Sequence, residues 1–119
     1  MDRIQALTAF WKSFNIPAYD VNTVPDNAVT PYLTFEIITD SFGNEVGITN
    51  SLWTRSTSWA EITQKSEEFY NYIGNGGVMV PYDNGAVWIK RATPFSQRLI
   101  DDDFKRIVMN FSMEFITSN

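Results

Sequence analysis

The chain has 119 residues, of which 44% are hydrophobic and 15% aromatic, enough to bury roughly two thirds of its unfolded surface in one domain spanning residues 1–119. It contains no cysteine and no histidine, so disulfides, thiolate nucleophiles, the commonest general base and the commonest metal ligand are excluded, and we expect a protein that is not an enzyme and uses no cofactor or metal. The net charge of −5 disfavours binding to nucleic-acid phosphates, and no apolar run approaches the ~20 residues of a membrane-spanning helix, so no membrane partner is expected.

The N-terminal residues predict a helix, then a strand. Asp2 is placed to cap a helix with one apolar stripe, and Pro17 is expected to end it. Residues 18–30 predict an extended segment and a loop, and residues 31–39 alternate between two faces, as in a strand. The helical stripe consists of Ile4, Leu7, Trp11 and Phe14.

A loop, a second strand and a second helix are predicted next. Residues 40–50 contain Gly43, Asn44 and Gly47, which are typical of a loop or hairpin tip, and residues 51–57 predict a strand. Ser58 and Glu61 have the spacing of a capping box that opens a helix, which Gly74 is expected to end. The core positions predicted for this helix are Trp59, Ile62, Phe69 and Ile73.

The C-terminal residues predict strands joined by a hairpin. Residues 78–81 and 85–91 are separated by a turn containing Asn84, and Pro94 is expected to break the chain. Residues 104–117 alternate over the longest stretch, which predicts a strand at the centre of the sheet. The order of elements predicts an α+β fold, with a mostly antiparallel sheet and two helices packed on one face.

Three patterns that could suggest a catalytic or ligand site are weak. Consecutive acids at 101–103 point alternately on an extended chain, so a solvated turn is favoured over a metal site. The glycines of 74–77 follow a helix, whereas a phosphate-binding loop precedes one. The Ser/Thr-rich residues 51–58 have no histidine to activate a hydroxyl.

Charge is distributed unevenly along the chain. Residues 13–54 contain five acidic residues and no basic one, whereas five of the nine basic residues lie between 90 and 106. These residues form either ordinary solvated surface or two oppositely charged faces, and the second arrangement favours head-to-tail contact between copies. The acidic residues are Asp20, Asp26, Glu36, Asp40 and Glu45, and the basic ones are Lys90, Arg91, Arg98, Lys105 and Arg106.

Several stretches, taken in this order and at this total length, resemble the small tail terminator or tail-completion proteins of long-tailed bacteriophages and prophages. They are residues 23–25, 30–36, 51–59, 88–91, 94–98 and 106–115. The resemblance implies a non-enzymatic α+β protein that assembles as a ring, usually a hexamer, and that is located in the virion tail at the head–tail junction after assembly in the host cytoplasm. Such a ring caps the last disc of the tail tube, stops its polymerisation and supports joining of the head.

A ring of this kind implies contacts with other copies, with the major tail tube protein and with a head–tail connector protein. We expect the acidic segment of residues 13–54 and the basic segment of residues 90–106 to meet between neighbouring subunits. We also expect an acidic lumen wall that repels DNA, which is a partner only as a passing polymer. The candidate interface residues are Asp40, Phe42, Glu45, Val46, Lys90, Arg91 and Arg98, and the candidate lumen residues are Asp101, Asp102 and Asp103.

The competing hypothesis is a monomeric module that binds single-stranded nucleic acid or a peptide. Aromatic and basic residues alternate at Trp88 and Lys90 and again at Phe95 and Arg98, as a stacking platform requires. This hypothesis predicts salt-sensitive oligonucleotide binding, which the ring hypothesis does not. An enzyme, the third alternative, would need a site built from Asp, Glu, Lys, Tyr and Ser alone.

Overall fold

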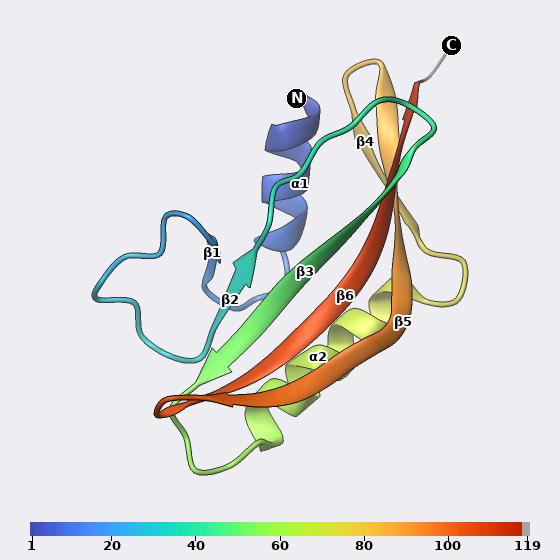
Figure 1. Ribbon diagram of the computed structural model, residues 1–119. Helices are drawn as coiled ribbons and strands as arrows, with labels where there is room; N and C mark the ends of the chain where they lie inside the picture. The colour runs from blue at the N-terminus through green and yellow to red at the C-terminus, as the bar shows by residue number, and fades with distance from the viewer. Residues whose placement is uncertain (118–119) are drawn as a thin grey trace.

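A computed structural model describes residues 1–117 (Figure 1). Within these residues, one six-stranded sheet has the strand order β1-β2-β3-β6-β5-β4, in which only β1 and β2 are parallel neighbours. The expected α+β fold is therefore confirmed. The elements are α1 (Arg3–Trp11), β1 (Ala18–Asp20), β2 (Tyr32–Phe35), β3 (Glu45–Thr54), α2 (Ala60–Ile73), β4 (Val78–Tyr82), β5 (Gly85–Asp101) and β6 (Phe104–Thr117).

Helix α1 begins as predicted and ends earlier than its apolar stripe. The Asp2 carboxylate accepts a hydrogen bond from the Gln5 amide at 2.8 Å, and the Gln5 side chain accepts one from the Asp2 amide at 3.0 Å, which completes a capping box. Leu7 and Trp11 of this stripe are fully buried, whereas Ile4, at its start, is 51% exposed. Helical spacing alone does not show how far the neighbouring layer extends.

Strand β3 begins well before the sequence predicts. Residues 45–50 were expected in a loop, yet β3 pairs with β6 along its whole length, from Glu45 opposite Glu114 to Thr54 opposite Lys105. Because a long partner strand supplies the ladder hydrogen bonds, the low strand propensity of Gly47 is overridden. Strand β2 is correspondingly shorter than predicted, ending at Phe35.

Side-chain hydrogen bonds replace the ladder where β2 separates from β3. The Glu36 carboxylate accepts from the Thr49 amide at 2.6 Å, and the Asn50 side-chain oxygen accepts from the Glu36 amide at 3.1 Å. These two bonds satisfy backbone groups that would otherwise lose their strand partners. They fix the point at which the segment carrying Asp40 and Phe42 leaves the sheet.

Helix α2 has the predicted core but not the predicted cap. Ile62, Phe69 and Ile73 are buried, and Gly74 ends the helix with a positive φ of 68°. The capping box expected at Ser58 is absent, because the helix begins after Trp59 and the Ser58 hydroxyl accepts instead from the Ala60 amide at 3.0 Å.

The long β5–β6 hairpin dominates the sheet, and β6 lies in its interior, as predicted. The expected break at Pro94 is wrong, because β5 continues to Asp101. Register with β6 shifts between Arg91 and Ser96, so the intervening residues form a bulge. The side-chain amide of Asn110 donates to the Pro94 carbonyl at 3.0 Å and anchors this bulge to β6.

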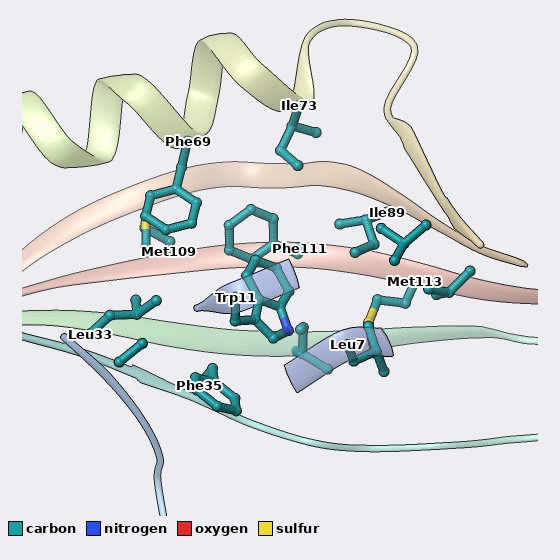
Figure 2. Packing of buried hydrophobic residues seen from close by; sticks show 14 of the residues in the cluster. Leu7, Trp11, Leu33, Phe35, Phe69, Ile73, Ile89, Met109, Phe111 and Met113 are labelled. Atoms are coloured by element: carbon teal, nitrogen blue, oxygen red, sulfur yellow. The ribbon is translucent and has the colours of Figure 1, made fainter. Parts of the chain in front are cut away.

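Both helices pack on the same face of the sheet, around Phe111 of β6. Figure 2 shows Trp11 from α1 and Phe69 from α2 converging on this ring, with centroid separations of 5.0 Å and 6.4 Å. Phe14, just beyond α1, stacks on Phe69 at 3.9 Å. This aromatic junction fixes the two helices relative to β6, and neither helix covers the opposite face of the sheet.

Candidate interaction surfaces

The acidic and basic segments lie on different halves of the sheet. Asp20 is on β1, Asp26 is in the loop that follows it, and Glu45 begins β3. Arg91 and Arg98 are on β5, and in the strand order β2, β3 and β6 separate β1 from β5. The fold therefore keeps most charges of the two segments apart, because β1 and β5 lie at two sides of the molecule (Figure 1).

Lys90 and Glu45 are an exception, because they pair within one chain. The Lys90 ammonium is 2.5 Å from a Glu45 carboxylate oxygen, across β6, and 4.4 Å from the Trp88 ring centroid. Both residues were predicted to contact a neighbouring subunit. Since each already has an oppositely charged partner, they are weaker sources of attraction between copies than unpaired charges are.

Phe42, in the loop before β3, is exposed, whereas Val46, the second residue of β3, lies closer to the core. Phe42 is 55% exposed and lines a shallow cleft of about 300 Å³ beside Ile116. Val46 is half-buried and packs against the core. The Asp40 carbonyl accepts from the Arg3 guanidinium at 2.8 Å, which ties this loop to α1. Among these loop residues, Phe42 is the most prominent apolar projection.

Asp101, Asp102 and Asp103 occupy the exposed turn of the β5–β6 hairpin. Asp101 is 3.9 Å from Arg106, and Asp103 is 3.7 Å from Arg55, with all three carboxyl-bearing residues solvated. Within residues 1–117 no group of three acidic side chains is placed to hold a metal ion. The turn is a charged projection with an exposed apolar neighbour, Ile100, at 76% exposure.

The four residues of the competing binding-module hypothesis lie on two faces. Trp88 pairs in register with Glu114 and shares the helix-free face with Lys90. Phe95 instead contacts the core ring of Phe111 at 5.4 Å, and Arg98 lies over Trp59 at the start of α2. The structure therefore does not bring these side chains together into one stacking platform.

A row of aromatic rings on the helix-free face was missed by the sequence analysis. Tyr19, Tyr32, Trp53 and Phe104 follow one another across β1, β2, β3 and β6, with neighbouring centroids 5.7, 6.5 and 5.6 Å apart. The Arg106 guanidinium lies 4.6 Å from the Trp53 centroid. Only the alternation of each strand could have placed these rings on one face, and the pairing of distant strands decides that they are neighbours.

A larger cleft lies between α2 and the chain around β1 and β2. Its volume is about 420 Å³, and its lining includes Ile16, Val29 and Pro31. The one cation of this lining, Lys65, pairs with Glu68 at 2.8 Å and donates to the Phe14 carbonyl at 2.9 Å. The cleft therefore has an apolar wall and a satisfied charge.

No protein-family model matches the chain, and no curated protein matches it. A solved structure resembles it with a TM-score of 0.58 and 13% sequence identity, over 97% of this chain and 91% of that protein. At this sequence identity the likeness shows the fold alone. Within residues 1–117, the two helices are too short or too polar to cross a membrane.

Proposed function

We propose that this protein is a non-enzymatic structural component of a bacteriophage tail, forming a ring at the head-proximal end of the tail tube. The ring, six copies in this proposal, ends polymerisation of the tube and supports joining of the head. Its partners are other copies, the major tail tube protein and a head–tail connector protein. Assembly takes place in the host cytoplasm, and the product resides at the head–tail junction of the virion.

The observation that carries the proposal is the separation of charge across one sheet. The acidic side at β1 and the basic side at β5 are different surfaces, so one copy can contact the next through unlike patches. Contacts of this heterologous kind close into a ring when the rotation between copies allows it. The molecule is also elongated, with extents of 49 × 29 × 21 Å, and projects apolar side chains at Phe42 and Ile100.

The stretches that resemble tail terminator proteins support the same proposal. Most lie on the sheet, at β2, at the end of β3, on both sides of the β5 bulge and along β6. Most of these stretches therefore belong to the sheet that keeps the acidic and basic sides apart. In a ring, the acidic hairpin turn of residues 101–103 is proposed to face the lumen, where its charge repels passing DNA.

Deleting the gene from its phage or prophage tests the function directly. We expect tail tubes of uncontrolled length without attached heads, visible by negative-stain electron microscopy, and normal tails once the wild-type protein is supplied from a plasmid. Tails of normal length that carry heads in the deletion strain would contradict the proposal. Replacing residues 101–103 with asparagine is expected to leave rings intact and reduce infectivity.

A further inference from the structure

Two arginines of β5, one on each side of the bulge, lie over aromatic rings of the α2 region. The Arg91 guanidinium carbon is 3.8 Å from the Tyr70 centroid, and Arg91 also donates to the Asn75 side-chain oxygen. The Arg98 guanidinium carbon is 4.9 Å from the Trp59 centroid. Because stacking restricts both side chains, their remaining N–H donors are held in place for a planar anionic group.

Neither arginine has a carboxylate within ion-pair distance among residues 1–117, although the chain has more acidic than basic residues. Lys90, immediately before Arg91, is by contrast paired with Glu45. A guanidinium has five N–H donors, and the contacts found for each arginine use only some of them. The two side chains are therefore the preorganised, unpaired cations of this surface.

The surface beside Arg91 is partly apolar and hollowed. A cleft of about 380 Å³ beside the bulge is lined by Tyr70, Arg91 and Phe95, among others. Arg91 and Arg98 pair with residues four apart on β6, which places their backbones about 13 Å from each other along the strand. We call this surface, made of Trp59, Tyr70, Arg91, Phe95 and Arg98, the arginine ridge.

The loop between β1 and β2 has the complementary chemistry. Val29 is 76% exposed and Val21 is 46% exposed, and the exposed Asp26 between them forms no side-chain hydrogen bond or ion pair with residues 1–117. No lysine or arginine occurs anywhere in residues 13–54. An acidic group flanked by exposed aliphatic side chains matches a ridge that combines guanidinium groups with aromatic rings.

The loop and the ridge of one chain do not meet in the structure, since Asp26 forms no hydrogen bond or ion pair with Arg91 or Arg98. Three strands lie between β1 and β5, which separates these two strands by roughly 19 Å at the usual spacing of neighbouring strands. In the proposal a contact between them joins two copies, and because the two surfaces differ, it continues from copy to copy.

We propose that the β1–β2 loop of one copy docks on the arginine ridge of the next, with the Asp26 carboxylate accepting hydrogen bonds from a ridge guanidinium and the valines packing on Tyr70 and Phe95. This contact rests on the proposed ring and identifies the surfaces that form it. It assigns the attraction to Arg91 and Arg98 rather than to Lys90, whose charge is already paired within the chain.

Two charge reversals, tested separately and mixed, examine this contact. Asp26→Lys and Arg91→Glu are each expected to raise the protein concentration needed for assembly by about tenfold or more, measured by light scattering. An equimolar mixture is expected to recover assembly in even-membered rings, because alternating copies pair the new lysine with the new glutamate at one contact and retain the native pair at the next.

A matched control reverses a charge elsewhere. Lys12→Glu alters an exposed residue at the end of α1, outside both surfaces, and is expected to assemble like the wild type. Wild-type assembly by both Asp26→Lys and Arg91→Glu, or failure of their mixture to recover it, would overturn the docking contact and leave the ring intact. A wild-type protein that never assembles would overturn the ring as well.

A second measurement tests whether the arginine ridge binds nucleic acid instead of another copy of the chain. The wild-type protein is titrated with a fluorescent single-stranded oligonucleotide at low salt. We expect no binding that depends on the ridge, so Arg91→Glu and Arg98→Glu should leave the titration unchanged. Salt-sensitive binding that both variants abolish would assign the ridge to phosphates and overturn its role as a contact between copies.

Discussion

Replacing Phe111 with alanine should destabilise the whole fold, because this side chain joins both helices to the sheet. Phe111 is fully buried, and its ring centroid lies 5.0 Å from that of Trp11, 6.4 Å from that of Phe69 and 5.4 Å from that of Phe95. Truncation of a buried phenylalanine costs about 3–5 kcal/mol. Since aromatic pairs contribute beyond buried area, we expect a loss of about 4 kcal/mol.

Urea unfolding followed by tryptophan fluorescence measures this loss, and thermal unfolding should show a decrease in Tm of roughly 15 °C. The matched control is Phe42→Ala, whose ring is 55% exposed, and its free energy of unfolding should change by less than about 0.5 kcal/mol. A loss below about 2 kcal/mol for Phe111→Ala would refute the reasoning, because the helices would then not depend on one shared aromatic junction.

Three further predictions concern local structure, each measured as a change in the free energy of unfolding. Asp2→Ala removes the α1 cap and should cost about 1 kcal/mol, and an unchanged stability would argue against the capping box. Gly77→Ala should cost more than about 1 kcal/mol, since φ is +77° and the new Cβ would lie 2.6 Å from a carbonyl oxygen of β5. The control Gly47→Ala should be nearly neutral, because nothing lies within 4 Å of its new Cβ, and equal effects of the two substitutions would contradict this prediction. A double-mutant cycle on Glu45 and Lys90, measured on the monomer, should give a coupling energy of about 0.2–1 kcal/mol. A coupling energy of zero would show that the two side chains do not form an ion pair in the folded chain.

Elements with local signals were predicted well from the sequence. The alternation of residues 104–117 placed β6 inside the sheet, and Ile62, Phe69 and Ile73 marked the buried side of α2. The turn at Asn84, whose φ is 68°, was recognisable because asparagine before glycine tolerates this conformation. In each case the determining residues are neighbours in the chain, so their pattern is visible without knowledge of the fold.

Features that depend on distant partners were predicted poorly. Residues 45–50 form strand because β6 lies beside them, and β5 passes Pro94 because a bulge anchored by Asn110 absorbs the proline. Ile4 fits the helical stripe but lies beyond the buried layer. Pairing and burial of this kind arise from contacts between residues far apart in the sequence, which periodicity does not encode.

For the interaction surfaces too, the local charge pattern could be predicted from the sequence, whereas the contacts between distant residues could not. The sequence shows that acidic and basic residues occur in separate segments, and the sheet order keeps most of them apart. It does not show that Glu45 and Lys90 meet across β6, or that Arg91 and Arg98 rest on rings of the α2 region without a carboxylate partner. The register of the strands and the position of α2 decide which of these charged side chains are paired within the chain and which are not.

The most direct test of ring formation is the mass of the wild-type protein in solution, measured by light scattering over a wide range of protein concentration and at low and high salt. The proposal predicts a species of about 82 kDa, six times the 13.7 kDa of one chain. The fraction of the protein in this species should rise with protein concentration and fall with added salt. A single species of 13.7 kDa under all these conditions would contradict it.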